Sequence, residues 1–240
     1  MKVTLIAKTQ LEWLETSIDS LTQMEVVTPY RPHYGNDLSE IGPLGSHLDE
    51  LAEFSGRIDY ESFGRPNPQT ATNKGYVANI IDKQHFSVLE HASATFYIDG
   101  VSRNFTHELI RHRHLSFSEV SQRYVDVSEF EFVIHPGLED IDPIEIHTVL
   151  SPAKSVYRTI MDALTKKGVP RKQARQAARH VLPSGLETKI LVTGNMRAWR
   201  ELLPKRLSPT ADKEFQLVAQ KILVELKKIA PNTFQDFDGD

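Results

Sequence analysis

The sequence contains no cysteine, and this absence removes several classes of chemistry at once. Without cysteine there is no disulfide framework, thiolate metal site or iron–sulfur cluster, and no mechanism can use a cysteine nucleophile. The first residues, Met1 to Thr9, lack the long apolar region of a secretory signal. No stretch approaches the roughly 18 to 20 apolar residues that span a bilayer. These absences predict a cytoplasmic protein in a reducing compartment and argue against membrane insertion.

The chain also has little excess charge. Its 240 residues include 28 Lys and Arg against 32 Asp and Glu, which gives a net charge of −4. A general nucleic-acid coat usually carries a net basic surface, so no nucleic-acid partner is expected. The apolar content of 40% is enough to form a core in a chain of this length without staples.

Three common motifs are missing as well. The sequence holds no G-x-S-x-G, no G-x-G-x-x-G and no G-x-x-x-x-G-K-[ST]. A serine hydrolase elbow, a Rossmann fingerprint and a P-loop are therefore absent. If the protein binds a dinucleotide, it must do so without a glycine-rich phosphate loop of either kind.

Hydrophobic periodicity predicts a fold that mixes strands with helices. Alternation of apolar and polar residues predicts strands over 3–7, 92–98, 130–134 and 186–192. Helical spacing and capping residues predict helices over 44–55 and 73–83, from Ser102 to about Arg113, from Ser151-Pro152 to Gly168, over 170–179, from Asn195 to Arg206, and from Ser208-Pro209 to Ile229. Turn-rich loops are expected over 29–43 and 64–70.

This order of elements favours an α/β or α+β fold. We expect one domain over 1–237, with a mixed, partly antiparallel sheet flanked by helices and a mainly helical second half. A short acidic tail, 238–240, would follow it.

Arginine and histidine gather between Arg103 and Arg123. The segment contains Arg103, Arg111, Arg113, Arg123, His107, His112 and His114, against only Glu108 and Glu119. The planar fork of arginine matches phosphate or carboxylate oxygens, and three serine hydroxyls can add neutral donors. Charge runs are often solvated surface loops, which is the alternative here. The lack of lysine and the position after an apolar strand and helix favour an anion site.

A metal site is a weaker interpretation of the same segment. Five of the ten histidines, His85, His91, His107, His112 and His114, fall within thirty residues. The run from His107 to His112 resembles HExxH with one residue too many. A spacing of five places two imidazoles about 140° apart on a regular helix, so they cannot chelate one ion. Arginines on both sides of His112 would also repel a cation, and no metal is expected.

The segment 111–123 has a specific pattern, RHRxxSxxxxSxR. It resembles the signature of the flavin-dependent thymidylate synthases, which methylate dUMP without an active-site cysteine. The similarity covers roughly 54–237 and is weakest between about 15 and 51. It includes His85-x-Ser87-Val88-Leu89-Glu90-His91, Ala178-Arg179-x-Val181-Leu182-Pro183, Gly194-Asn195-x-Arg197 and Arg206.

The resemblance implies a flavoprotein methyltransferase of dTMP biosynthesis that uses FAD, with NADPH and methylenetetrahydrofolate as co-substrates. Residues implied on the flavin side are Ser87, Arg111, His112, Arg113, Glu119, Asn195 and Arg197, with His85 and Glu201 near the flavin ring. Residues implied for dUMP are Glu108, Leu109, Ile110, Arg111, Glu119, Val120, Ser121, Gln122, Arg123, Arg179 and Arg206. It also implies a homotetramer whose sites take residues from more than one chain.

The sequence departs from the common family pattern at two positions. Glu201 stands where many relatives have asparagine or histidine, which puts that flavin contact in doubt. Asp212 stands where many have glutamine, a variation that we expect to leave activity intact.

The chemical problem is that C5 of uracil is a poor nucleophile and no thiolate can add at C6. Loss of the N3 proton would spread charge toward O4 and C5, and a guanidinium aimed there would favour that anion. The resemblance implies Arg206 for this catalytic role. Taken alone, Arg206 is better interpreted as a cation that satisfies the dipole and last carbonyls of a helix C-terminus.

Two other classes of protein stay open at this point. A noncatalytic nucleotide or RNA-binding module could use the arginine-rich loop, with Phe105, Phe117 and Tyr124 as stacking surfaces. A metal-dependent hydrolase would need bound zinc. A purified flavoprotein is yellow, whereas an RNA binder is colourless.

Overall fold

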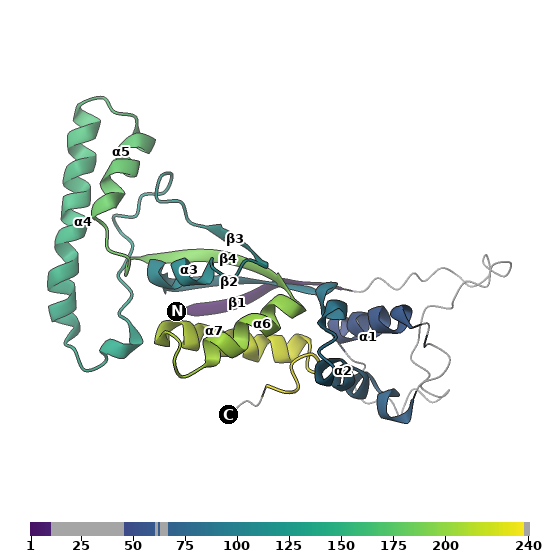
Figure 1. Ribbon diagram of the computed structural model, residues 1–240. Helices are drawn as coiled ribbons and strands as arrows, with labels where there is room; N and C mark the ends of the chain where they lie inside the picture. Colours follow the sequence, from purple (N-terminus) through teal and green to yellow (C-terminus); the bar gives the residue numbers. More distant parts are fainter. Residues whose placement is uncertain (11–45, 61, 63–66, 238–240) are drawn as a thin grey trace. The chain divides into compact units, whose positions relative to one another are not determined.

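The computed structural model describes residues 1–10, 46–60, 62 and 67–237. The strands are β1 (Lys2–Lys8), β2 (Ser93–Ser102), β3 (Leu115–Glu119) and β4 (Glu187–Asn195), and the sheet order is β1-β2-β4-β3 (Figure 1). The sheet is antiparallel and flanked by helices, which confirms the expected mixture of helix and strand. None of the described helices combines the length and apolar character needed to cross a membrane.

The helices are α1 (His47–Asp59), α2 (Asn73–Asp82), α3 (Arg103–Leu109), α4 (Pro143–Lys166), α5 (Arg171–Ala178), α6 (Met196–Leu207) and α7 (Lys213–Ile229). The described residues form two compact units. The first unit lies within 1–6, 95–193 and 202–221, and the second within 7–94, 194–201 and 222–240. The single domain over 1–237 stays a prediction.

Alternating residues build the sheet core of the first unit. Phe96 and Ile98 on β2, and Ile190 and Val192 on β4, are buried, and a period of two places each pair on one face of its strand. The hydroxyls of Thr95 and Thr193 face each other at 2.9 Å across the two strands. The strands expected over 3–7, 92–98 and 186–192 are therefore confirmed.

A buried carboxylate ties the start of α3 to α7. Glu214 accepts hydrogen bonds from the backbone N–H of Ser102, at 2.7 Å, and from its hydroxyl. The same hydroxyl accepts from the N–H of Phe105, so Ser102 is the N-cap that the sequence predicts. Phe105 packs edge-on against Phe215 of α7, with ring centroids 4.7 Å apart. This network fixes where α3 begins.

The second unit is held by a buried polar network. The carboxylate of Asp49 on α1 accepts from the backbone N–H groups of Asn232 and Thr233, at 3.0 and 2.8 Å. Arg57 pairs with Glu53 on the same helix at 2.8 Å. On α6, the indole of Trp199 is fully buried and donates to the carbonyl of Gly194 at 3.0 Å. These contacts fix the segments of this unit that surround the start of α6.

Three predicted elements differ from the structure. The strand over 130–134 is wrong, because only Phe132 pairs there, in an isolated bridge with Leu186. The start at Ser151-Pro152 is wrong, because α4 begins at Pro143 after the cap Asp142 and carries Pro152 inside it. The start at Ser208-Pro209 is wrong, because α7 begins at Lys213, where Asp212 accepts from the N–H of Phe215 at 3.1 Å. All of the loop predicted over 29–43 and part of that over 64–70 lie outside the described residues.

We expect Glu214→Ala to lower the free energy of unfolding by about 2 to 3 kcal/mol, because it leaves the buried N–H of Ser102 without an acceptor. Urea denaturation followed by circular dichroism measures this. The control is Glu225→Ala on the exposed part of α7, which removes a surface ion pair with Lys228 and should change stability by less than about 0.5 kcal/mol. Equal losses in the two variants would contradict the buried role.

Candidate functional site

In the first unit, the block Arg111-His112-Arg113 follows the end of α3. The N–H groups of Arg111 and His112 donate to the carbonyls of Glu108 and Leu109, at 3.3 and 3.0 Å, so the chain turns sharply after the helix. Leu109 is fully buried and anchors this turn, whereas Arg111 and Arg113 are exposed. The prediction that this block lies at the C-terminal end of the helix is confirmed.

Arg206, in the last turn of α6, is held from three directions. Its Nε donates to Nε2 of His112 at 3.0 Å, and its Nη1 donates to a carboxylate oxygen of Glu108. Its guanidinium carbon lies 4.3 Å from the centroid of the Phe215 ring. A cation that only satisfied the helix C-terminus would not need these partners. The plane of the guanidinium is therefore fixed.

His112 is neutral in this arrangement. The pKa of His112 is lowered to about 4, first by burial and then by the positive charges of Arg206 and Lys205, while Glu108 acts in the opposite direction. The hydrogen bond from Arg206 needs a lone pair on Nε2, so the imidazole proton is assigned to Nδ1. The imidazole serves as an acceptor for Arg206 and adds no charge of its own.

Glu119 ends β3 and is held by a second set of contacts. Its Oε1 lies 3.1 Å from Nη1 of Arg103 and accepts from the hydroxyls of Thr106, at 3.0 Å, and Thr188, at 3.1 Å. None of these three partners was singled out for Glu119 from the sequence. The alternation on β4 does place Thr188 at an inward position among apolar neighbours, which is the one local signal of a special role.

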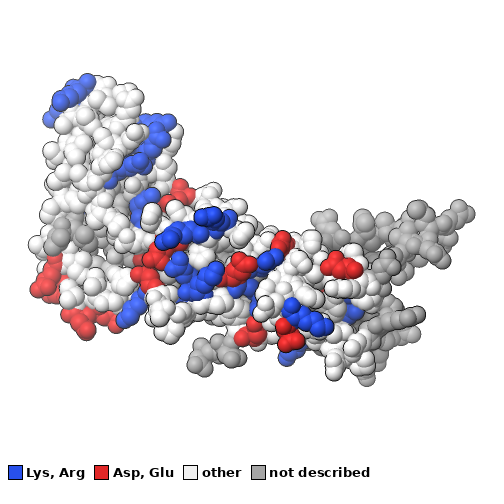
Figure 2. Space-filling view, in the orientation of Figure 1, with Lys and Arg blue, Asp and Glu red and all other residues white. Residues whose placement is uncertain are grey.

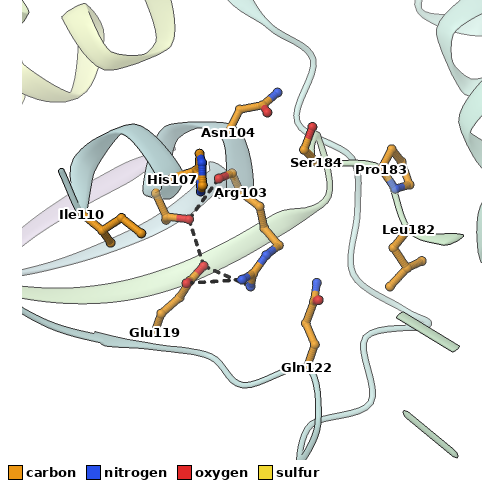
Figure 3. A pocket seen from close by; sticks show the side chains of 10 residues that line it. Arg103, Asn104, His107, Ile110, Glu119, Gln122, Leu182, Pro183 and Ser184 are labelled. Atoms are coloured by element: carbon orange, nitrogen blue, oxygen red, sulfur yellow. Dashed lines mark hydrogen bonds and ion pairs between the residues drawn. The ribbon is translucent and has the colours of Figure 1, made fainter. Parts of the chain in front are cut away.

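A cavity of about 390 Å³ lies beside Glu119. Its lining includes Arg103, Thr106, His107, Glu119, Gln122 and Pro183, and Figure 3 shows the ion pair between Arg103 and Glu119 within it. Ile110 also borders the cavity. The cavity is polar on the side of α3 and Gln122 and apolar at Ile110 and Pro183, a combination typical of small-molecule sites.

The segment after Glu119 carries predicted substrate residues. The N–H of Val120 donates to the carbonyl of Lys189 at 3.1 Å, and the chain then turns at Ser121, whose carbonyl accepts from Tyr124 at 3.0 Å. Gln122 is buried and Ser121 is exposed. The Nε of Arg123 is buried and has no hydrogen-bond partner among the described residues.

Five predicted flavin-side residues lie in the second unit. The side-chain oxygen of Asn195 accepts from the N–H of Ala198 at 2.8 Å, which confirms it as the cap of α6. Arg197 pairs with Glu90 at 2.7 Å and with Glu201 at 3.1 Å. His85 and Ser87 are exposed at the start of a short turn of helix, Phe86–Glu90. Hydrogen bonds from Arg197 to the carboxylates of Glu90 and Glu201 raise the pKa of Arg197 above its ordinary value.

The structure brings together some of the predicted site residues and not others. Glu108, His112 and Arg206 are in direct contact. Leu109 has a fully buried side chain, so only its backbone can reach a ligand. Arg179 begins a short helical turn after α5 and forms no ion pair within the part of the chain that the structure describes. All these residues stay predictions as binding groups.

The charge of the site is mixed rather than uniformly positive. On the face shown in Figure 2, Lys and Arg side chains are interspersed with Asp and Glu. Among the described residues, no group of three or more His, Asp and Glu side chains is placed to hold a metal ion. Arg111 and Arg113 form no ion pair with any residue of the described ranges, which leaves two cations for an anionic ligand.

Comparison with known proteins defines the class of this protein. Residues 44–232 match a family described as thymidylate synthase complementing protein. A flavin-dependent thymidylate synthase of Mycobacterium avium is 50% identical over 199 residues, 78% of this chain and 79% of the relative. Proteins of the same name from Mycolicibacterium vanbaalenii and Mycobacterium tuberculosis strain H37Ra are 50% and 48% identical over similar shares. The chain belongs to the flavin-dependent thymidylate synthase family and is an enzyme of that type.

We expect NMR titration to give a pKa near 4 for His112, and Arg206→Met to move it toward 6.5, because one of the charges that lower it is removed. The neutral imidazole stabilises the fold fully above about pH 6.5, its unfolded pKa, and this contribution is lost as the pH falls toward 4. The exposed His107 is the internal control and should be unaffected by the substitution. An unchanged pKa for His112 in Arg206→Met would contradict the contact.

Proposed function

We propose that the protein converts dUMP to dTMP, with methylenetetrahydrofolate as the carbon donor and NADPH as the reductant through FAD. The observation that carries this proposal is the fixed guanidinium of Arg206 in a family member without cysteine. Membership of the family makes the protein a flavin-dependent thymidylate synthase. We further propose the particular cofactor, the co-substrates and the role of each residue.

The residues present fit FAD. The cofactor carries a pyrophosphate, and Arg111 and Arg113 are exposed cations without ion pairs in the described ranges. Residues that the family resemblance implies for it, from one or more subunits, are Arg111, His112, Arg113, Glu119, His85, Ser87, Asn195, Arg197 and Glu201. When bound, FAD supplies hydride transfer between NADPH and the one-carbon unit.

The residues present also fit a nucleoside monophosphate. The Nε of Arg123 is buried without a partner among the described residues, and Gln122 lies buried at the cavity edge. A bidentate arginine suits a phosphate, while an amide can pair with a pyrimidine edge or a ribose hydroxyl. In this proposal Glu108, Ser121, Arg179 and the backbone of 109–111 and 120 complete the contacts to dUMP.

Arg206 would activate the uracil ring. A guanidinium does not act as a base at neutral pH, but it stabilises an anion that forms beside it. Glu108 occupies Nη1 and His112 occupies Nε, so Nη2, whose contact with the carbonyl of Glu108 is long at 3.5 Å, is the least engaged nitrogen. That nitrogen would favour loss of the proton from N3 and so raise the nucleophilicity of C5.

The assembly is part of the proposal. We propose a homotetramer whose sites take residues from more than one subunit, as the family resemblance implies. Analytical ultracentrifugation of the purified flavoprotein measures the mass directly, and a monomer at micromolar concentration would contradict this part.

A reconstitution assay tests the proposed reaction. Purified protein is mixed with FAD, NADPH, methylenetetrahydrofolate and dUMP, and dTMP is measured by chromatography. Controls omit the flavin in one reaction and the nucleotide in another. Formation of dTMP that requires both supports the proposal. A colourless protein that binds RNA and forms no dTMP would support the noncatalytic alternative.

We expect Arg206→Ala to keep the fold and bound FAD but to lower kcat by about a hundredfold or more, since it removes the group that stabilises the developing anion. Flavin absorbance per subunit and steady-state turnover measure the two effects. Arg158→Ala is the matched control, because Arg158 is an exposed arginine on α4 that pairs with Glu129. Turnover unchanged in Arg206→Ala would contradict the assigned role.

A further inference from the structure

We propose that Thr188, Thr106 and Arg103 are positioning residues for nucleotide binding. Together they fix the carboxylate of Glu119, and through it the segment 120–123 that carries predicted dUMP contacts. We call these four residues the Glu119 cluster. The inference rests on the proposed function, because it deepens the description of the same site, and it concerns how Thr188, Thr106 and Arg103 act through Glu119.

The contacts of the cluster are partly buried. The hydroxyls of Thr106 and Thr188 both donate to Oε1 of Glu119, at 3.0 and 3.1 Å. The two threonines are 3% and 1% exposed. Arg103 approaches both carboxylate oxygens, with Nη1 3.1 Å from Oε1 and Nη2 3.5 Å from Oε2 (Figure 3). Hydrogen bonds to an ionised acceptor are stronger than neutral ones, so this carboxylate is held firmly.

The cluster joins three elements at the point where β3 ends. Arg103 and Thr106 lie on α3, Thr188 on β4, and Glu119 is the last residue of β3. One further backbone bond, from Val120 to Lys189, follows before the chain turns at Ser121. The Glu119 cluster is therefore the last side-chain anchor before the predicted substrate segment.

The electrostatics of the cluster also suit this role. A carboxylate among residues that bind a phosphate would repel the ligand if its charge were unbalanced. Arg103 neutralises Glu119, while the two hydroxyls satisfy its lone pairs without adding charge. Arg103, which holds Glu119, and Gln122, which lies in the segment that Glu119 positions, line the same cavity.

The test compares two substitutions on the same strand. Thr188→Val removes the hydroxyl that contacts Glu119 and keeps the side-chain volume. Thr193→Val is the matched control, because its hydroxyl contacts only Thr95 among the described residues. The Kd of dUMP for the purified flavoprotein is measured by calorimetry without NADPH or folate, together with KM, kcat and flavin absorbance per subunit.

We expect Thr188→Val to raise the Kd and KM of dUMP about tenfold. The kcat at saturating dUMP, expressed per bound flavin, should stay within about twofold of the wild type, as should every value for Thr193→Val. Thr188→Ser, which restores the hydroxyl, should bring the Kd back to within about threefold. A structural role alone would not separate KM from kcat or be rescued in this way.

An unchanged Kd for dUMP in Thr188→Val would overturn the proposal, as would an equal rise in Thr193→Val or a failure of serine to restore binding. Should Thr188→Val fold poorly, Arg103→Met at a half-buried position gives the same test, with the same tenfold rise expected. The proposed function fails separately, through the absence of dTMP in the wild-type reaction. The calorimetric comparison does not depend on that reaction.

Discussion

The site depends on the orientation of one guanidinium. Arginine is always charged, so its usefulness lies in where its five N–H groups point. The guanidinium of Arg206 donates to the carboxylate of Glu108 and the imidazole of His112, and it lies over the phenyl ring of Phe215. The neutral state of His112 is essential, because an imidazolium would repel Arg206 and offer it no acceptor. The low pKa of one half-buried histidine thus controls the direction of the proposed catalytic cation.

The arginines of the first unit divide into two kinds. Arg103 and Arg206 are paired with Glu119 and Glu108, and these pairs orient side chains. Arg111, Arg113 and Arg123 form no ion pair among the described residues and remain available for anionic ligands. An enzyme whose substrates and cofactors are all anions needs both kinds. Unpaired cations attract charge, whereas paired ones define the geometry in which a reaction can occur.

Local signals in the sequence predict much of the fold. Ser102 and Asn195 are caps because their side chains satisfy N–H groups within three residues. The alternation on β2 and β4 is equally local. The strand expected over 130–134 fails because alternation does not guarantee a partner, and only Phe132 finds one. In the same way β3 was missed, since its residues lie inside a polar motif. Contacts such as Thr188 to Glu119 join positions 69 residues apart, and no local pattern encodes them.

The charge of the segment 103–123 illustrates why the site could be located but not resolved from the sequence. Counting gives four arginines against two glutamates, an excess of two positive charges before the histidines. In the structure Arg103 forms an ion pair with Glu119, and Arg206, 98 residues away in sequence, forms one with Glu108. Three arginines of the segment 103–123 therefore remain unpaired, whereas the count within the segment alone leaves an excess of two. Because Arg206 lies outside the segment and neutralises Glu108, it makes the site one charge more positive than the segment alone. Arg206 is also the residue proposed for catalysis. The proposed activation of the substrate and the proposed attraction of its phosphate would both draw on this contact between α6 and α3.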